Sequence, residues 1–192
     1  LPADDYMVGM SIQPHNMQLA LAQNMSSIEM QWNQTIPQQE KGRKFEEKYA
    51  QLQYMFVGGD IEKLSEVKAD RAKESARLKW IAYKDQFFST VLIADDAFES
   101  TQMESTPLNA LSRYIKEYNT TTSLPLDITG KKTTDLHYYL GPNHYNTLKA
   151  YDKDVEKADR LHLNELVPLG WKIVSWINKA LVIPMFNLFT SW

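Results

Sequence analysis

The side chains with the clearest potential for chemistry are the histidines, which act as bases and bind metals in proteins. The chain has four of them, His15, His137, His144 and His162, and none has the HExxH or HxH spacing of a metal site. His137 stands beside two tyrosines in a strand-like segment, so we expect core or cross-strand packing for it rather than catalysis. His144 stands in a predicted turn, where we expect a structural hydrogen bond. The histidines therefore predict no metal site.

Adjacent carboxylates offer a second kind of chemistry. Asp95 and Asp96 follow an apolar segment and are a candidate pair for general acid–base catalysis. Aspartate also caps backbone groups in the turn that ends a strand, and we favour this structural role. Gly58-Gly59 is too short to cradle a phosphate, and the chain lacks GxGxxG, Walker and GxSxG patterns. The sequence therefore predicts a protein that is not an enzyme and has neither a cofactor nor a small-molecule substrate.

The bulk composition is that of a folded globular domain. Of the 192 residues, 43% are hydrophobic and 23% are charged, with a formal net charge of -3 and no cysteine. These values exclude disulfides and thiolate metal sites and argue against a nucleic-acid partner. Lys and Arg interleave with glutamates between residues 40 and 48, which indicates a solvated helix face. The chain opens at Leu1-Pro2 without a signal segment, so we expect an excised or processed piece of a longer protein.

Short segments with strand character recur along the chain. The apolar residues alternate in several of them, as they do in half-buried strands. The segment 87–93 is apolar on both faces, which predicts a central strand buried between two layers. The expected strands are residues 6–10, 28–32, 51–57, 78–95 and 135–140, with weaker candidates at 98–103 and 114–118.

Charged and polar segments separate these strands. One or two helical turns are expected in residues 40–50, and an exposed loop or short helix in the strongly charged residues 62–76. Breaks between strands are expected at 121–125 and 129–131. Residues 17–22 fit either strand or helix. Residues 143–151 predict a short helix, with Asn143 as its cap. The pattern predicts a mainly β fold, an antiparallel β-sandwich with C-terminal α-helices.

The last stretch, residues 168–192, reads PLGWKIVSWINKALVIPMFNLFTSW. On a helical wheel the lysines fall on one side and the aliphatic residues on the other, and Pro184 ends or kinks the helix. Lysines, asparagines and this proline interrupt the stretch too often for a transmembrane span, which needs roughly twenty apolar residues. We predict an amphipathic helix on a membrane surface; the alternative is a helix that packs on its own domain. The predicted contact residues are Trp171, Ile173, Val174, Trp176, Ile177, Leu181, Phe186 and Phe189.

Three segments in order resemble the periplasmic region of the YidC family of bacterial membrane-protein insertases, in its Bacteroidetes-like form. They are residues 78–95 (LKWIAYKDQFFSTVLIAD), residues 138–148 (YYLGPNHYNTL) and residues 163–192, which begin LNELVPLGWKIV. They are similar to the family's central strand, its GP turn with a short helix, and its entry into the interfacial helix that precedes a transmembrane segment. The resemblance covers most of the chain from Tyr6 onward.

The resemblance implies a β-sandwich of the supersandwich, galactose-mutarotase-like type, in residues 1–165, that begins partway through the family's sandwich. It also implies that residues 166–192 form an interfacial helix before a transmembrane core outside this sequence. The implied location is the periplasmic face of the bacterial inner membrane. The implied role is insertion and folding of membrane proteins, with the membrane surface and client membrane proteins as partners, alone or beside the Sec translocon.

Two other classes of function remain open from the sequence. A carbohydrate-binding or mutarotase-like sandwich requires a concave face with exposed aromatic rings and a histidine paired with a carboxylate. A secreted structural or adhesion module requires the C-terminal tail to pack into the sandwich. Both alternatives predict contacts that a structure can show.

Overall fold

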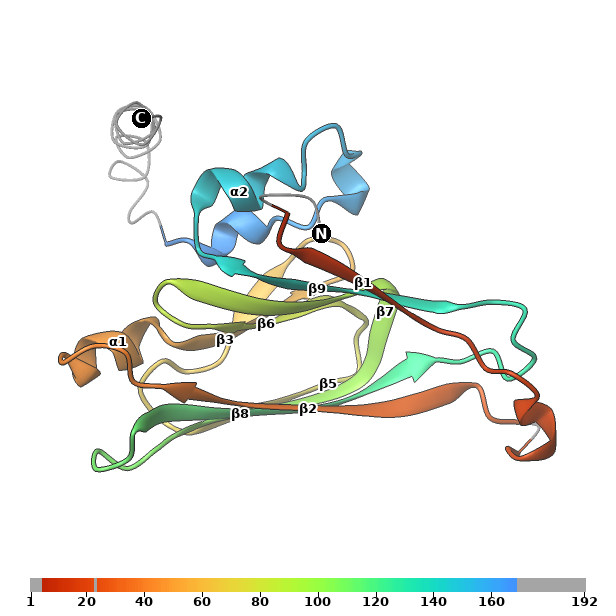
Figure 1. Cartoon of the computed structure of the whole chain (residues 1–192), viewed down its shortest axis with the longest axis horizontal. Helices are drawn as coiled ribbons and strands as arrows, with labels where there is room; N and C mark the ends of the chain where they lie inside the picture. The colour runs from red at the N-terminus through yellow and green to blue at the C-terminus, as the bar shows by residue number, and fades with distance from the viewer. Residues whose placement is uncertain (1–4, 23, 169–192) are drawn as a thin grey trace.

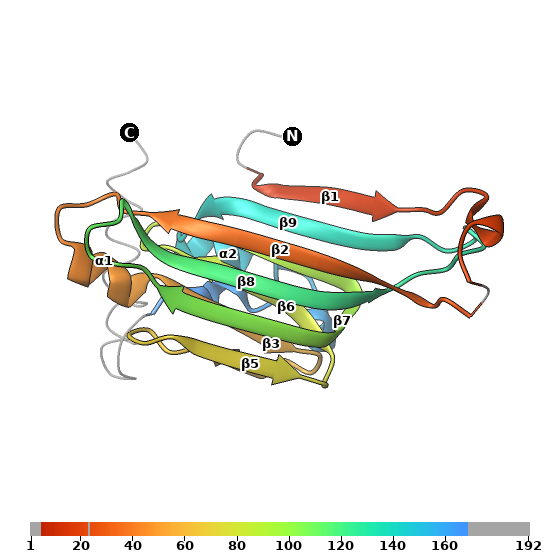
Figure 2. The same cartoon turned by 90° about the horizontal axis from the view of Figure 1, so that it is seen from below.

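The described part of the chain forms two facing β-sheets with a layer of short helices outside one of them (Figure 1). This computed structural model describes residues 5–22 and 24–168. Figure 2 shows the second sheet from its outer side, with long strands that lie along the long axis of the molecule. The mainly β, antiparallel sandwich with helices late in the chain is confirmed.

The first sheet has the strand order β1-β9-β7-β6-β3-β4, and all of its described pairings are antiparallel. Its centre is the β6–β7 hairpin, in which Ala82 faces Val91. The strands are β1 (Met7–Ile12), β3 (Gln51–Phe56), β4 (Ile61–Lys63), β6 (Leu78–Lys84), the first part of β7 (Phe88–Pro107) and β9 (Thr134–Pro142).

The second sheet contains β2 (Ser27–Pro37), β8 (Tyr114–Pro125), the second part of β7 and β5 (Asp70–Glu74). The long strand β7 therefore belongs to both sheets: residues 88–94 pair with β9, and residues 99–107 pair with β8. The register of β7 against β8 shifts between Glu99 and Gln102, and Ser100 adopts a left-handed φ of 48°. Such a bulge bends a strand, which lets β7 pass from one sheet to the other.

Helical segments lie at the edges of the sandwich and on one face. The 3₁₀ turn η1 (Met17–Leu19) lies in the β1–β2 connection, and α1 (Arg43–Tyr49) lies in the β2–β3 connection. The remaining segments, α2 (Tyr145–Ala150), η2 (Lys157–Asp159) and η3 (Leu163–Leu166), follow β9 and cover the outer face of the first sheet (Figure 1).

Two apolar cores follow from this layering. Between the sheets, Ile81, Leu92 and Tyr118 belong to a cluster of fully buried residues. On the outer face of the first sheet, Trp80 and Val91 pack with Leu148, Leu163 and Leu166 of the helical layer. Successive residues of a strand point to opposite faces, so β6 and β7 must be apolar on both sides. The predicted central strand buried between two layers is confirmed for residues 91–94, whereas Phe87 and Phe88 are exposed at the β6–β7 turn.

The structure differs from the sequence-based expectations in three segments. Residues 78–95, predicted as one strand, form β6, a turn and the first part of β7. Residues 62–76, predicted as a loop or short helix, contribute β4 and β5. In β5, Arg71 and Lys73 point to solvent while Ala72 packs against the core, and the charges typical of an exposed edge strand hide the apolar period. Residues 121–125, predicted as a break between strands, lie inside β8. Thr122 is buried there and shares a 2.7 Å hydrogen bond with Thr101.

Candidate functional site

Asp95 and Asp96, the candidate pair for acid–base chemistry, both lie at the surface, and each has a separate partner. Asp95 Oδ1 lies 2.9 Å from Nδ1 of His137, across the β7–β9 pair. Asp96 accepts a hydrogen bond of 2.7 Å from Lys132 Nζ, and this lowers the pKa of its carboxyl group. Each carboxylate has its own partner, so the pair does not share a proton. Neither residue ends a strand as predicted, because β7 continues through both of them.

His137 makes the expected cross-strand contact but is half-exposed, so the core position is wrong. His144 has the structural role expected, with Nδ1 2.8 Å from Thr147 Oγ1. Asn143 does not cap α2; its side-chain amide instead donates to the carbonyl of Asp85 at 2.8 Å. Within residues 5–22 and 24–168, no three His, Asp or Glu side chains are grouped so as to hold a metal ion.

The rings that a sugar-binding face would use pack the interior instead. Trp80 is fully buried, and its Nε1 donates to the carbonyl of Leu161 at 2.7 Å. Trp32 stacks on Tyr83 with ring centroids 3.7 Å apart. These two tryptophans hold layers together, so they do not offer the exposed platform that the carbohydrate hypothesis requires.

One carboxylate joins two segments of the helical layer, the turn after α2 and the segment before η3. Asp152 Oδ1 accepts from the backbone N–H of Leu161 at 2.6 Å, and Oδ2 accepts from that of His162 at 2.9 Å. His162 adopts a left-handed φ of 50° and is the N-cap residue that precedes η3. Leu163 and Leu166 of η3 are then buried on the sheet. This segment is the last described element before the predicted tail.

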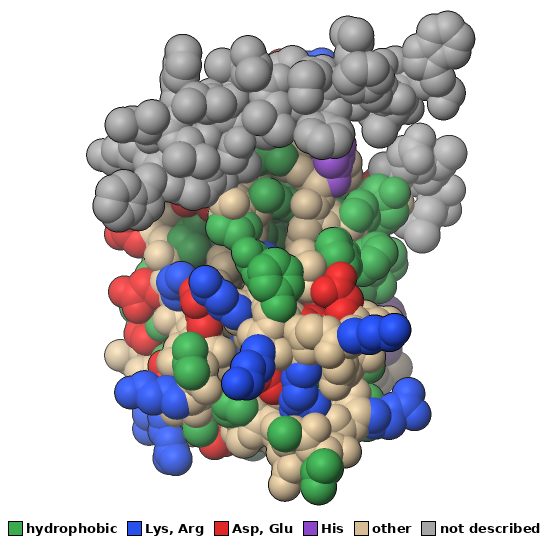
Figure 3. All heavy atoms as spheres, turned by 90° about the vertical axis from the view of Figure 1, so that its left-hand side faces the viewer, with side chains coloured by type: hydrophobic (Ala, Val, Ile, Leu, Met, Phe, Trp, Pro, Cys, Tyr) green, Lys and Arg blue, Asp and Glu red, His purple; other side chains and the backbone are tan. Residues whose placement is uncertain are grey.

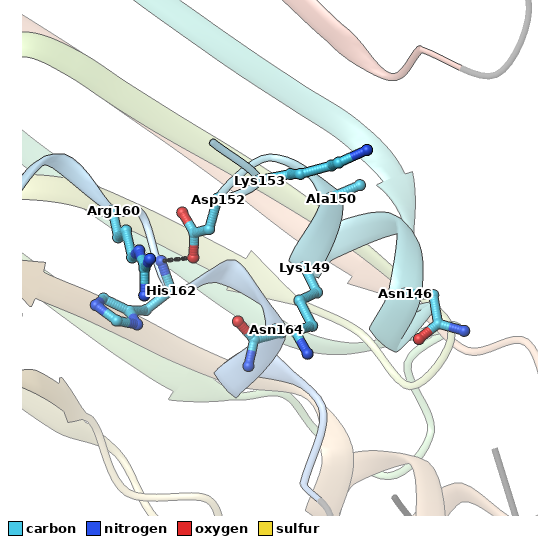
Figure 4. A pocket seen from close by; sticks show the side chains of 8 residues that line it. All are labelled: Asn146, Lys149, Ala150, Asp152, Lys153, Arg160, His162 and Asn164. Atoms are coloured by element: carbon cyan, nitrogen blue, oxygen red, sulfur yellow. Dashed lines mark hydrogen bonds between the residues drawn. The ribbon is translucent and has the colours of Figure 1, made fainter. Parts of the chain in front are cut away.

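A basic cleft of about 470 Å³ opens in this layer (Figure 4). It lies between α2 and the segment that leads into η3, and the Asp152 carboxylate points toward the His162 backbone inside it (Figure 4). Because that carboxylate is used in the fold, the remaining ionisable side chains of the cleft are basic. They are Lys149, Lys153, Arg160 and His162.

A second cleft, of about 480 Å³, lies at the end of the sandwich that holds α1, which we call the α1 end. It is lined by Lys48, Lys63 and Lys84 together with Leu166 and Pro168, where the described chain stops. Strand register places the start of β3 beside the end of β6 here, with Gln51 opposite Lys84. Figure 3 shows this end, with Lys and Arg side chains, and some Asp and Glu side chains, interspersed among apolar ones.

Two lysines are buried beneath the α1 end. Lys116 is 1% exposed, and its Nζ donates to the carbonyls of Ala50 and, at 2.7 Å, Glu66. Lys84 is also buried, and its Nζ donates to the carbonyl of Tyr49 at 3.3 Å. Burial lowers the pKa of each lysine to about 8, because the charged form loses its hydration.

The sequence analysis did not predict the burial of these two lysines, nor the burial of two charged residues of α1. Its lysines are exposed as predicted, but Arg43 is largely buried and donates to the carbonyls of Leu108 and Ser112 at 2.9 and 2.7 Å. Glu46 is 1% exposed and accepts from the backbone N–H of Gln39 at 2.8 Å. For Lys116, the only signal in the sequence was a charge on the strand face that also carries Tyr118 and Leu124.

The predicted membrane-contact residues lie outside the described part of the chain. They are Trp171, Ile173, Val174, Trp176, Ile177, Leu181, Phe186 and Phe189. Among the residues that the structure does describe, no helix has the length and apolar character needed to cross a bilayer.

Comparison with known proteins gives a consistent result. The family model of the YidC periplasmic domain matches residues 1–184. A membrane protein insertase YidC from Azobacteroides pseudotrichonymphae genomovar. CFP2 is 49% identical over 191 residues, which cover 100% of this chain and 31% of that protein. The protein of the same name from Parabacteroides distasonis is 46% identical over 97% of this chain and 29% of its own length. That from Bacteroides fragilis is 41% identical over 100% of this chain and 31% of its own.

The fold defines the class: an antiparallel β-sandwich domain with a C-terminal helical layer. The chain belongs to the YidC periplasmic domain family. The resemblance seen in three sequence segments is thereby confirmed. The chain spans about 30% of the length of these curated relatives.

Proposed function

We propose that this chain is the extracytoplasmic part of a membrane-protein insertase and works at the periplasmic face of the bacterial inner membrane. In this proposal it aids the insertion and folding of membrane proteins by protein and membrane-surface contacts, without covalent chemistry. The observation that carries the proposal is the family match over residues 1–184, together with relatives named membrane protein insertase YidC.

The described structure supports a mechanical role for the C-terminal layer. Leu163 and Leu166 of η3 are buried on the first sheet, and the Asp152 carboxylate holds the segment before them. The segment that leads to the tail is thus packed against the sandwich up to Leu166. The proposed boundary between sandwich and tail, at residues 165 and 166, falls within η3.

The tail itself is proposed to lie in the bilayer interface. Its contacts would be the tryptophans, phenylalanines and aliphatic residues predicted from the sequence, Trp171 to Phe189. Each large apolar side chain moved from water into the bilayer contributes about 1.5–3 kcal/mol, so a few of them suffice for stable attachment. Client membrane proteins and Sec translocon components are the proposed protein partners.

Tryptophan fluorescence of the 192-residue chain tests the membrane proposal. Addition of lipid vesicles is expected to shift the emission of Trp171, Trp176 and Trp192 to shorter wavelength, because their rings leave water. The matched control replaces these three by phenylalanine and keeps the packed Trp32 and Trp80. An unshifted spectrum of the native chain, or an equal shift in the control, would contradict the proposal.

A further inference from the structure

Exposed large apolar side chains gather at the α1 end of the sandwich. Phe87 and Phe88 lie at the β6–β7 turn and are 51% and 61% exposed. Phe45 of α1 and Val67 in the β4–β5 connection are also more than half exposed. Single exposed apolar residues are common on protein surfaces, but these belong to separate connections at one end of the sandwich (Figure 1).

Strand pairing brings these connections together. Phe88 lies opposite Pro142 in the β7–β9 pair. Leu140, which is half-exposed, lies two residues before Pro142 in β9. The β4–β5 connection is held to the same end by a hydrogen bond of 2.9 Å from Gln51 Nε2 to Glu66 Oε1. The patch is therefore assembled from segments that are distant in sequence.

The charges that surround this patch are suited to an anionic surface. Lys41, Lys44 and Lys48 are exposed on or beside α1. Two nearby carboxylates are engaged within the domain: Glu47 accepts from Arg43 at 2.6 Å, and Glu66 pairs with Lys63 at 2.8 Å. A third, Glu46, is buried against backbone N–H groups. The exposed lysines thus face solvent, while Glu46 is buried and Glu47 and Glu66 each have a basic partner.

The α1 end is also where the chain passes toward the tail, because Pro168 and Leu166 line the same cleft as Lys48 and Lys63. We propose that the α1 end is a second membrane-contacting surface, in which Phe87 and Phe88 enter the interface of an anionic phospholipid bilayer and the α1 lysines contact lipid phosphates. Apolar side chains flanked by lysines are the composition that binds such interfaces. This inference rests on the proposed attachment of the tail, which would bring this end close to the bilayer.

Site-specific fluorescence separates this surface from the tail. The chain has no cysteine, so Phe87→Cys in residues 1–192 can be labelled with an environment-sensitive dye. Leu19→Cys is the matched control, because Leu19 is equally apolar, exposed, and part of η1 at the opposite end. Vesicles of phosphatidylglycerol and phosphatidylcholine are expected to shift the emission of the label at position 87 and to leave that at position 19 unchanged.

The outcomes are distinguishable from failure of the tail proposal. If the chain sediments with vesicles but the label at position 87 does not respond, the tail binds and the second surface is refuted. If the chain does not sediment with vesicles at all, the proposed function fails as well. A response of the label to protein concentration without vesicles would show self-association of this face and would also overturn the inference.

Neutralising the exposed lysines tests the electrostatic part of the proposal. The variant combines Lys41→Gln, Lys44→Gln and Lys48→Gln. At about fivefold for each lysine near an anionic bilayer, the vesicle affinity is expected to fall by roughly 100-fold when all three are replaced. The control, Lys79→Gln with Lys131→Gln and Lys132→Gln, makes the same change of net charge at the opposite end. Equal loss in both triple variants would mean that net charge, and not the α1 end, attracts the membrane.

Discussion

Lys116 shows how a single residue can carry information that its sequence neighbours do not. It lies in β8 between Ile115 and Glu117, is fully buried, and its ammonium group donates to the carbonyls of Ala50 and Glu66. A buried charge is costly unless it is hydrogen-bonded, so these carbonyls must converge on Nζ. The residue therefore helps to join β8 to the start of β3 and to the β4–β5 connection.

The lowered pKa of Lys116 predicts a specific pH dependence. Its pKa is about 8 in the folded state, against an ordinary value of 10.5. Between these values the unfolded chain binds more protons, so the free energy of unfolding rises with pH. Relative to Lys116→Met, the native protein is expected to gain about 2 kcal/mol between pH 7.5 and 9.5. Urea denaturation at several pH values measures this difference.

Lys48→Met is the matched control for this experiment, because it makes the same substitution at an exposed position of α1. Its denaturation curves are expected to follow the native pH dependence throughout. The assignment would be wrong if Lys116→Met and native protein showed the same change of stability with pH.

At the scale of elements, the C-terminal layer depends on contacts between segments that are each too short to be stable alone. The helix α2 has six residues and η3 has four, and isolated helices of that length do not persist in water. They are held by Leu148, Leu163 and Leu166 against the outer face of the first sheet, and by Asp152 between them. Packing, and not helix propensity, keeps the root of the tail in place.

Asp152→Ala is expected to loosen this layer without unfolding the sandwich. It removes two hydrogen bonds from backbone N–H groups to a carboxylate, at a cost of about 2–4 kcal/mol. Hydrogen exchange of the amides in residues 161–166 should accelerate, while the amides of β8 stay protected. Asp159→Ala is the control, since no side-chain partner of Asp159 is found in the described part of the chain. Equal protection of residues 161–166 in Asp152→Ala and native protein would argue against this role.

For the molecule as a whole, β7 makes the two sheets one cooperative unit. Its first part pairs with β6 and β9 and its second part with β5 and β8, so neither sheet can open without releasing a strand of the other. Both described cores are formed by residues between Tyr6 and Val167. The fold is thus expected to be stable without the tail.

Truncation after Pro168 tests this expectation. The shortened domain should unfold in a single transition, with a Tm within about 4 °C of the native chain, which corresponds to roughly 1 kcal/mol for a domain of this size. Calorimetry of both forms measures it, and the two forms should differ clearly in vesicle binding. Loss of the cooperative transition would instead favour the structural or adhesion module, in which the tail packs into the sandwich.

Sequence alone was sufficient for the features that depend on local periodicity. The two-sided apolar segment of residues 87–93 predicted a central strand, and alternation predicted β1, β2, β3 and β9 within a few residues. Family resemblance in residues 78–95 and 138–148 was confirmed by the comparisons. The strand β5 was not predicted, because an edge strand is solvated on one side and its charges mask the apolar period.

Tertiary structure alone decided which distant residues meet. The pairing of His137 with Asp95, the burial of Lys84 and Lys116, and the gathering of Phe45, Phe87 and Phe88 at the α1 end all follow from sheet order and register. A periodic pattern records only which face of an element is apolar; the partner of that face is set by packing between elements, to which one sequence gives no direct access.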